Sequence, residues 1–435
     1  MAENTQSRSG TPARAGVLDL LHLGAALGVD KLKGKKSDPA AAGRRWADKV
    51  MSRDGGGDID LPVVPIELVG NREHSNQVLS SVPDLSGFEA GKTKTEAMSF
   101  LAPGALTIAN GDAWRRLRPF NEQVLGTGSP HQYAQTFLTH VRSAFAAPVH
   151  NEDDIRTSMG RAMVRIVLGD VSPQLDPAGD VTKLFGVVQS PIRRKLLGFL
   201  YRRRRERLYD LIARKWEHAN ESSEGVQEHT LLAMAAHHGG DADRTTLLQQ
   251  VPHWMFTFTG SGTDLLTRAL CLITSRPRVH ARVKQEIHAC GLIDEAQAIG
   301  RLAYLDACIL EAGRLFPPVT KTFHQRRSTG DGRRAGEYAH YFPILQRDDS
   351  LGPTVHDFRP ERWLETPLDA AAAASNLFLR GPRACPGMDL ILFVCKAAIA
   401  RQIAELNVSA LQERLARAPL PISFPKVSAR FTTSG

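Results

Sequence analysis

Apolar residues recur at helical spacing over most of the chain, so the pattern predicts a mostly α-helical protein. Apolar positions three or four residues apart are typical of helices that bury one face. The segments with this pattern cover residues 17–32, 112–125, 131–146, 155–170, 193–215, 243–277, 278–290, 301–316 and 387–403. From residue 317 to about residue 375 the spacing is replaced by short extended pieces, turns and Pro-rich loops. We expect long helices with a minor strand component in one large unit.

The first 60 residues differ from the rest because they are polar and Gly-rich apart from one amphipathic piece, VLDLLHLGAALGVDKL. We therefore expect a partly irregular N-terminal extension over residues 1–60 and a single domain over residues 61–435. No run of about 18 apolar residues exists, which predicts no membrane-spanning helix. The N-terminus also lacks the charged and then apolar order of a secretory signal.

The charge balance is basic, with 55 Lys and Arg against 46 Asp and Glu and a net charge of +9. Such a balance admits nucleic acid, an acidic membrane surface or an acidic protein as partner. The densest basic run starts at Arg193, RRKLLGFLYRRRRERLYDLIARK, and its apolar residues fall at helical spacing. This pattern favours a long helix with a solvated basic face. We expect no nucleic-acid partner, since aromatic residues are sparse and no binding motif is present.

The chain has 5 cysteines, an odd number, and no CxxC pair. This spacing argues against a disulfide framework or a zinc site and favours a reducing, cytoplasmic setting.

Cys385 has neighbours that a packing cysteine does not need. It lies in NLFLRGPRACPGMDL, two residues after Arg383 and directly before Pro386 and an apolar, helix-forming run. Proline is tolerated in the first helical turn, so we expect Cys385 at a helix start, where free N–H groups favour a negative sulfur. Gly381 and Gly387 permit a tight loop close to a flat cofactor. The pattern predicts a thiolate ligand to a metal.

The stretch FLRGPRACPG fills every fixed position of the haem-binding loop of the cytochrome P450 family, F-x-x-G-x-R-x-C-x-G. These positions are Phe378, Gly381, Arg383, Cys385 and Gly387. The chain therefore resembles this family over roughly residues 75–430. The resemblance implies a long central helix over a haem and a small β-rich lobe. It also implies haem b, iron protoporphyrin IX, as cofactor, with Cys385 as iron ligand and Arg383 within reach of a haem propionate.

A second motif of the family precedes this loop. EAGR places Glu311 and Arg314 on one face of a helix, 74 residues before Cys385. A charged pair is costly to bury unless it is well partnered. In the family this pair locks the helix to a downstream loop through the arginine of a PERW-type segment, which corresponds to Arg362 in FRPERW. The role implied is structural and not catalytic.

Other positions resemble the contacts that the family makes to haem propionates. WRRLR places Trp114 and Arg118 at the first and fifth positions of the matching segment, for which a surface amphipathic helix is the alternative. His324 lies 13 residues after Glu311, where the family often has arginine or histidine. Arg326 is a nearby alternative to His324.

The central helix departs from the family pattern A/G-G-x-D/E-T, whose acid and alcohol deliver protons during oxygen activation. This helix contains TFTGSGTDLL. If the helix end is the reference point, Ser261 takes the alcohol position and Gly260 the acid position. The other register puts Asp264 at the acid position with a leucine in place of the alcohol, and Thr263 or Asp264 could also serve through a local helix distortion. Pocket lining and core packing are both open for Trp254, Phe256, Thr257 and Phe258.

The resemblance implies an oxidoreductase, a haem-iron monooxygenase that inserts one oxygen atom into a small organic, secondary-metabolite-like substrate. We expect electrons from a separate ferredoxin or flavoprotein, since the chain ends about fifty residues after Cys385. Arg115, Arg116 and Lys396 are expected as exposed cations on the face that meets this acidic partner. The incomplete acid–alcohol pair leaves an atypical member open, one that uses peroxide or catalyses a rearrangement or dehydration without reductant. A haem-binding sensor without turnover is a further alternative.

Overall fold

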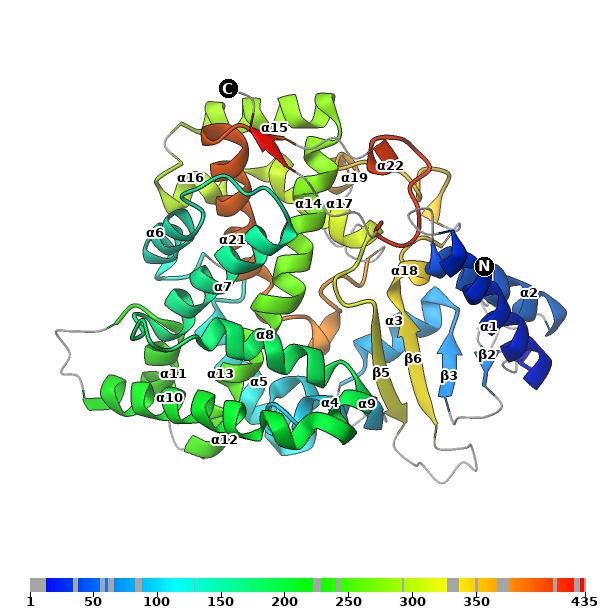
Figure 1. Ribbon diagram of the computed structural model, residues 1–435, viewed down its shortest axis with the longest axis horizontal. Coiled ribbons are helices and arrows are strands. Elements are labelled where there is room, and N and C mark those ends of the chain that lie inside the picture. The colour runs from blue at the N-terminus through cyan, green and yellow to red at the C-terminus, as the bar shows by residue number, and fades with distance from the viewer. Residues whose placement is uncertain are drawn as a thin grey trace, which may run out of the picture.

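Helices make up most of the chain that the structure describes, and a single larger β-sheet lies beside them (Figure 1). The structure is a computed structural model. It describes residues 13–33, 38–54, 59–61, 66–82, 88–128, 130–221, 228–239, 243–291, 293–326, 336–348, 351–365, 375–409, 413–425 and 431–433. The prediction of a mostly α protein with minor β structure is confirmed.

Amphipathic segments of the sequence form most of the helices between residues 72 and 416. These are α3 (Arg72–Ser80), α4 (Lys92–Ser99), α5 (Gly111–Leu125), α6 (Ala134–Ala144), α7 (Glu152–Leu168), α8 (Pro177–Val188), α9 (Pro191–Leu197), α10 (Arg202–Glu221), α11 (Leu231–His238), α12 (Arg244–Leu248), α13 (Gln250–Thr257), α14 (Thr263–Thr274), α15 (Pro277–Cys290), α16 (Ala296–Gly300), α17 (Ala303–Leu315), α18 (Phe342–Leu345), α19 (Arg362–Glu365), α21 (Met388–Ala400) and α22 (Glu413–Ala416). Shorter 3-10 helices are η2 (Leu106–Ile108), η3 (Gly198–Tyr201) and η6 (Gly381–Arg383), and π-helices are η4 (Phe258–Gly262) and η7 (Arg401–Glu405).

Two long predicted helices are interrupted in the structure. The basic run over residues 193–215 is divided into α9, η3 and α10. The break falls at Gly198, which is buried. A Cβ added to this glycine would lie 3.3 Å from the Phe100 ring. The segment 243–277 is divided into α12, α13, η4 and α14, and a turn of π-helix occupies the Thr/Gly/Ser cluster. Helical periodicity located both segments but not their interruptions.

The centre of the helical part is α14, which contacts α7, α15, α17 and α21. Its apolar face is fully buried, with Leu265 and Leu266 each 2% exposed and Ile273 0% exposed. Because α21 follows directly after Cys385, this packing brings the central helix close to the cysteine loop.

The sheet has the strand order β1-β2-β3-β6-β5-β4. Its strands are β1 (Ala13–Arg14), β2 (Ile59–Asp60), β3 (Ile66–Val69), β4 (Phe88–Ala90), β5 (Lys321–Arg326) and β6 (Glu337–Tyr341). At one edge β4 pairs antiparallel with β5, so that Ala90 lies opposite His324 and Phe88 opposite Arg326. A separate two-stranded sheet joins β7 (Val408–Ser409) to β8 (Thr432–Thr433).

Two helices occupy the described part of residues 13–54, α1 (Val17–Leu32) and α2 (Pro39–Asp54). The amphipathic pattern located α1 but not α2. Trp46 donates to the Asp19 carbonyl at 2.7 Å, and the Asp38 carboxylate accepts from the backbone N–H groups of Ile422 and Ser423 at 2.8 and 2.9 Å. The domain boundary at residue 60 stays a prediction.

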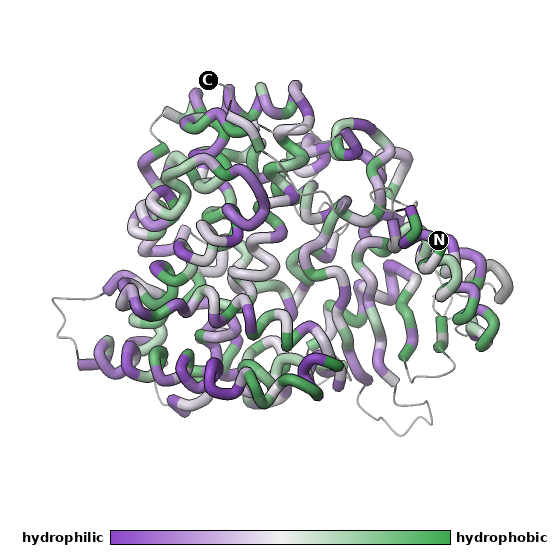
Figure 2. Tube along the Cα trace, in the orientation of Figure 1, coloured by the Kyte–Doolittle hydropathy of each residue, from purple (hydrophilic) through white to green (hydrophobic). Residues whose placement is uncertain are grey.

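Hydrophobic and polar stretches alternate along the coloured part of the trace (Figure 2). In keeping with this alternation, none of the helices in the described ranges has both the length and the apolar content required to cross a bilayer.

Candidate functional site

Cys385 lies in a tight loop three residues before the first residue of α21. Its N–H donates to the Phe378 carbonyl at 2.7 Å, and its own carbonyl accepts from the Met388 N–H at 3.3 Å. Two residues of this loop have left-handed backbone conformations, Leu379 with φ 58° and Gly381 with φ 54°. A leucine rarely adopts this conformation, and such conformations concentrate at functional sites. The predicted tight loop before a helix is present.

The charge state of Cys385 depends on opposing effects. Burial raises the pKa of its thiol above the usual value, whereas the Gly387 N–H and the charge of Arg118 act to lower it. The partners expected to favour a thiolate are thus in place, but desolvation outweighs them. A bound metal would favour the thiolate at this position, since metals bind cysteine in the deprotonated form and release its proton.

Helix α5 lies against the cysteine loop through Arg118. This guanidinium donates from Nη1 to the carbonyls of Pro382 and Ala384 at 3.0 and 2.6 Å, and its Nε pairs with Glu122 at 2.7 Å. Trp114, one turn earlier on α5, is half-buried and packs against the hydrophobic core. The structure therefore brings Arg118 against the loop of Cys385. The expected contact of Trp114 and Arg118 with haem propionates stays a prediction.

Four basic side chains from four separate elements form a cluster near this loop. They are Lys94 of α4, His253 of α13, His324 of β5 and Arg383 of η6. Burial and the charge of Arg383 lower the pKa of Lys94 to about 8. Burial and Lys94 lower the pKa of His253 to about 4. The charge of Arg383 acts on Lys94, and the charge of Lys94 acts on both histidines, so the four groups lie within electrostatic range of one another. We call them the cationic cluster.

The other two members of the cationic cluster show the same effect. Burial, together with Lys94 and Arg383, lowers the pKa of His324 well below its usual value. Burial lowers the pKa of Arg383 to about 10. Arg383 donates from Nη2 to the Phe88 carbonyl at 2.5 Å.

The cationic cluster contains buried nitrogens without a hydrogen-bond partner among the described residues. These are His253 Nδ1, His324 Nδ1 and Arg383 Nε. Within the same part of the chain, no carboxylate lies within ion-pair distance of Lys94 or Arg383. Unpaired buried donors are costly, and the charges of Lys94 and Arg383 repel each other. The arrangement therefore suits an anionic group that is bound from outside the chain.

The sequence motifs predict His324 and Arg383 at this site, whereas no motif includes Lys94 or His253. The latter two lie far from the motifs in sequence, and no spacing rule links them. Arg326, the alternative to His324, lies two residues further along β5 beside the Phe88 ring, with its guanidinium 5.8 Å from the ring centroid.

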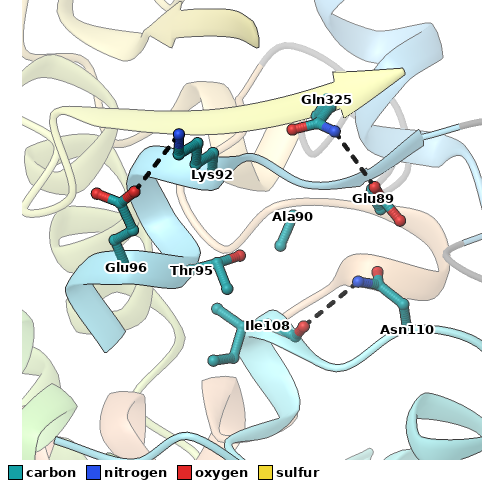
Figure 3. A pocket seen from close by; sticks show the side chains of 8 residues that line it. All are labelled: Glu89, Ala90, Lys92, Thr95, Glu96, Ile108, Asn110 and Gln325. Carbon is teal, nitrogen blue, oxygen red and sulfur yellow. Dashed lines mark hydrogen bonds and ion pairs between the residues drawn. The ribbon is translucent and has the colours of Figure 1, made fainter. Parts of the chain in front are cut away.

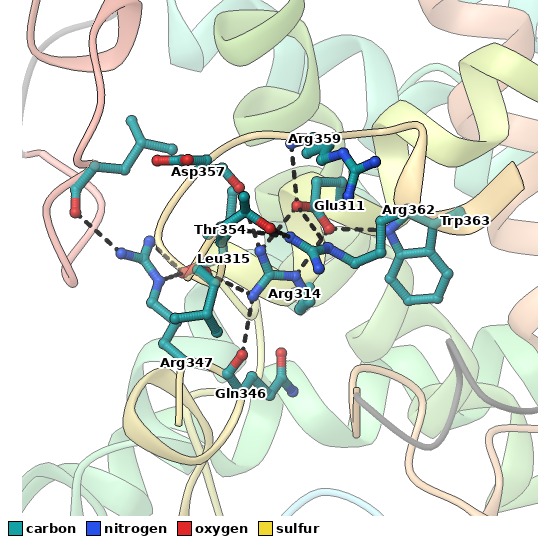
Figure 4. A network of polar contacts seen from close by, with 12 residues as sticks. Glu311, Arg314, Leu315, Gln346, Arg347, Thr354, Asp357, Arg359, Arg362 and Trp363 are labelled. Carbon is teal, nitrogen blue, oxygen red and sulfur yellow. Dashed lines mark hydrogen bonds and ion pairs between the residues drawn. The ribbon is translucent and has the colours of Figure 1, made fainter. Parts of the chain in front are cut away.

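A second group of charges surrounds the buried carboxylate of Glu311 (Figure 4). Arg314 donates to both of its oxygens at 2.8 Å, Trp363 donates at 2.9 Å, and Arg362 approaches to 3.4 Å. The backbone N–H of Arg359 also donates to Glu311 at 3.1 Å. Burial alone would raise the pKa of Glu311, but Arg314 and Arg362 lower it below the usual value. The predicted Glu311–Arg314–Arg362 contact is confirmed.

The guanidinium of Arg314 also holds the downstream loop. Its Nη1 donates to the carbonyls of Gln346 and Val355 at 3.0 and 2.9 Å, and its Nη2 donates to that of Asp357 at 3.3 Å. Arg347, which sequence analysis missed, extends the network by donating twice to the Leu315 carbonyl at 3.1 and 2.8 Å. These contacts join α17 to the loop before α19, which is a structural role.

The central helix carries the π-helix η4 at Gly260 and Ser261, the positions that one of the two registers assigns to the acid and the alcohol. A Cβ added at Gly260 would collide with the Phe185 ring of α8, so no acidic side chain fits there without a rearrangement. A Cβ at Gly262 would lie 2.8 Å from Ile391 of α21. Ser261 between them is half-buried. A π-helical turn inside a helix is frequent at functional sites.

Asp264 is engaged in an ion pair. Its carboxylate accepts from Arg268 Nη2 at 2.9 Å, and Arg268 Nη1 donates to the Phe316 carbonyl at 2.8 Å. Burial raises the pKa of Asp264, and Arg268 opposes that shift. In contrast, the buried hydroxyls of Thr259 and Thr263 have no partner among the residues described.

Of the four side chains considered as pocket lining, two are buried in the core and two are half-buried. Trp254 is 3% exposed and donates to Asn121 at 2.8 Å, and Phe258 is 6% exposed, so both belong to the core. Phe256 and Thr257 are half-buried, and Phe256 lies 4.7 Å from the Phe185 ring centroid.

One prediction about the surface is wrong. Lys396 is not an exposed cation, since it is 5% exposed and pairs with Asp306 at 3.0 Å. The helical pattern of α21 did not show that α16 and α17 cover this position. Arg115 and Arg116 of α5 are exposed, and Arg115 pairs with Asp112.

A shallow depression of about 270 Å³ lies at the β4–β5 edge of the sheet (Figure 3). Its lining is Glu89, Ala90, Lys92, Thr95, Glu96, Ile108, Asn110 and Gln325. Several of its polar groups bond to each other, such as Glu89 with Gln325 at 3.5 Å. None of the predicted site residues lines it, so it does not define the functional site.

The ligand set at Cys385 has a chemical consequence. In the described chain no group of three or more His, Cys, Asp or Glu side chains is placed to hold a metal ion. Cys385 and the neighbouring cationic cluster fit a metal cofactor that carries acidic groups of its own.

Comparison with known proteins agrees with this geometry. Residues 194–421, more than half of the chain, match the model of the cytochrome P450 family. The chain belongs to the cytochrome P450 family. The match includes the Glu311 network and the loop of Cys385.

Individual relatives of the cytochrome P450 family match over shorter stretches. Cytochrome P450 monooxygenase fscF of Fusarium equiseti is 29% identical over 146 residues, which are 30% of this chain and 27% of that protein. Cytochrome P450 82A1 of Pisum sativum is 33% identical over 148 residues, 30% of this chain and 26% of that protein. The matched stretch thus spans about a quarter of the length of these two relatives.

Among solved structures, the retinoic-acid-bound cyanobacterial CYP120A1 is similar, with a TM-score of 0.67 and 17% identity. The similarity covers 89% of this chain and 93% of that protein. At this identity it shows that the cytochrome P450 fold is shared.

Proposed function

We propose that this chain is a haem-thiolate monooxygenase of the cytochrome P450 family, with Cys385 as the ligand to the iron of haem b. The observation that carries the proposal is the loop of Cys385 beside an uncompensated cationic cluster. A bound haem would supply the activation of oxygen that inserts one oxygen atom into a small organic substrate. The fscF relative, whose name gives a monooxygenase, supports this class of reaction.

The residues of this chain would hold the cofactor by charge and by loop geometry. His324 and Arg383 would bind the propionates with Lys94, because all three are desolvated and the described chain offers them no carboxylate. Arg118 and Trp114 would position the cysteine loop from α5. Arg118 and the Gly387 N–H would stabilise the sulfur charge once the metal has displaced its proton.

The central helix would supply a hydroxyl without a neighbouring acid. Ser261 would act at the alcohol position, and Phe185 fills the space where the acid of other members would stand. Protons would therefore have to reach the site through water or a substrate hydroxyl. The missing acid also supports the alternative of a peroxide-driven or reductant-free reaction. Supplying substrate with hydrogen peroxide alone, or with reductase and NAD(P)H, distinguishes the two possibilities.

The decisive experiment replaces the proposed iron ligand. We expect the reduced, carbon-monoxide-treated protein to give the red-shifted Soret band of a thiolate-bound haem, and Cys385→Ser to abolish it. Cys290→Ser is the matched control because Cys290 is also half-buried and free. A band that survives Cys385→Ser, or that the unmodified protein never shows, would refute the assignment.

We further propose a cytoplasmic enzyme that receives electrons from a separate ferredoxin or flavoprotein at Arg115 and Arg116. Both cations are exposed on α5, the helix that contacts the cysteine loop through Arg118. Arg115→Glu with Arg116→Glu should slow electron transfer several-fold at low salt. Stopped-flow reduction measures this rate, and an unchanged rate would place the partner elsewhere.

A further inference from the structure

One face of the central helix carries side chains that the core does not cover completely. Within α13 and η4 the half-buried residues are His253, Phe256, Thr257 and Ser261, and the other residues of these two elements are buried. An α-turn takes about 3.6 residues and a π-turn nearly one residue more, so two such turns match the spacing from His253 to Ser261. The half-buried side chains therefore share one face of the helix.

The end of this face away from Ser261 has an unsatisfied polar group. The buried Nδ1 of His253 has no hydrogen-bond partner among the described residues. Within the cationic cluster, the charge of Arg383 acts on Lys94 and His324, whereas only that of Lys94 acts on His253. His253 is therefore the member of the cluster that lies farthest from Arg383.

The cationic cluster has more donors than the propionates of a haem require. His324 and Arg383 are the residues that the sequence motifs predict for them. Lys94 has three N–H donors and can contact a propionate and a second anion together. At neutral pH Lys94, with a pKa of about 8, is mostly charged, and His253, with a pKa of about 4, is neutral. Lys94 can thus supply charge to a second anion, and His253 can supply a hydrogen bond.

Aromatic rings lie beside the helix face between His253 and Ser261. The Phe256 ring centroid is 4.7 Å from that of Phe185 on α8. The Phe185 ring also lies against the backbone of Gly260, directly before Ser261. At about 1.5 Å per residue, the helix covers about 10–12 Å from His253 to Ser261. A ligand held at His253 would therefore contact aromatic rings before it reaches Ser261.

On the basis of the proposed function, we propose that His253 and Lys94 bind the carboxylate of an acidic substrate. Its aromatic or apolar body would extend along Phe256 and Phe185 to Ser261. The carbon presented at Ser261 would then lie about 10–12 Å from the carboxylate. An uncharged ligand would fill the aromatic part but leave the His253 nitrogen and the Lys94 charge without a partner, which favours an acid.

The test compares ω-phenylhexanoic acid, which spans about 10 Å when extended, with its methyl ester. Calorimetry and the ligand-induced change in haem absorbance each give the dissociation constant for the haem-loaded, full-length protein. We expect the acid to bind at least about tenfold more tightly than the ester, since only the acid can pair with Lys94. His253→Phe should raise the dissociation constant of the acid about tenfold and leave that of the ester unchanged. His253→Gln keeps an N–H donor and should retain part of the preference.

His280→Phe is the matched control, because His280 of α15 is also half-buried with a ring nitrogen that lacks a partner among the described residues. It should bind both ligands as the unmodified protein does. The proposal is overturned if acid and ester bind equally, if neither binds, or if His253→Phe and His280→Phe have equal effects. It is equally overturned if His253→Phe loses haem, since the histidine would then serve the cofactor.

The carbon monoxide band of the same preparation tests the proposed function separately. A thiolate band together with equal binding of acid and ester would refute the substrate assignment alone. Absence of the band would refute the haem-thiolate assignment, on which the substrate assignment rests.

Discussion

The Glu311 network and the cationic cluster both bury several charges, but they differ in how those charges are compensated. Around Glu311 each carboxylate oxygen accepts from arginine, and the Arg314 guanidinium also bonds to loop carbonyls. In the cationic cluster, Lys94 and Arg383 have no acidic partner among the described residues, and two histidines keep an unpaired nitrogen. The first region is complete within the chain, whereas the second is complementary to an anionic ligand.

The difference also appears in the directions of the pKa shifts. The pKa of Glu311 is lowered despite burial, because its partners favour the charged form. Burial lowers the pKa values of Lys94 and His324, and the charge of Arg383 lowers both further. Both effects disfavour the charged forms of the two side chains. Paired charges stabilise a fold, and unpaired ones of a single sign indicate a binding site.

The largest expected effect comes from breaking the complete network. Glu311→Ala should lower the free energy of unfolding by about 3–5 kcal/mol, because it leaves Arg314 buried without its counter-charge. Urea denaturation of the haem-loaded protein measures the change. Glu217→Gln is the control, since Glu217 pairs with Arg244 at 2.8 Å on the surface and should cost less than about 1 kcal/mol. Equal losses in the two variants would contradict the distinction between the regions.

A smaller effect of opposite sign is expected in the cationic cluster. Without haem, Lys94→Met should raise the free energy of unfolding at pH 7 by about 1 kcal/mol, since it removes a desolvated charge. The same variant should release haem faster. Lys92→Met is the control, because Lys92 lies on the same helix with a side chain that is 78% exposed.

The pH dependence of Lys94 has a defined sign. With a folded pKa of about 8 and an ordinary value of 10.5, the unfolded chain binds the extra proton between these pH values. The contribution of Lys94 to the free energy of unfolding therefore rises with pH across this window. The advantage of Lys94→Met should be full below pH 8 and should disappear as pH approaches 10.5. Denaturation curves that keep a constant difference over this range would show that Lys94 is not desolvated.

The smallest effect is expected in the central helix, where Asp264 is a paired charge. Burial raises the pKa of Asp264 although it pairs with Arg268, so desolvation of the carboxylate offsets the attraction between the two charges. Asp264→Asn should therefore change the free energy of unfolding by only about 1 kcal/mol or less. It should leave the product formed per NAD(P)H consumed unchanged, whereas Ser261→Ala should lower that yield. Loss of yield in Asp264→Asn alone would instead support the register that uses this acid.

Much of the candidate site follows from local sequence. The Cys385 loop, the Glu311–Arg314 spacing and the WRRLR segment each lie within a few adjacent residues, where backbone requirements select glycine, proline and arginine directly. Their positions in the structure agree with these patterns. The helices of the core were located for the same reason, because helical periodicity is a local property.

Other features depended on distant packing. The basic helix is interrupted at Gly198, which packs closely against Phe100, and Gly260 admits no acid because of Phe185. The pattern on α21 placed Lys396 at the surface, yet α16 and α17 cover it. None of these outcomes is encoded in the residues beside the position concerned.

The sequence alone is enough to assign the mostly helical class, the cysteine loop and the pairing of Glu311 with Arg314, since each depends on neighbouring residues. The cationic cluster could be recognised only after folding, because Lys94, His253, His324 and Arg383 are brought together from four separate elements. The desolvation of these charges is also decided only by the folded structure. The solvent that a charge loses, and hence its pKa, depends on every segment that packs around it.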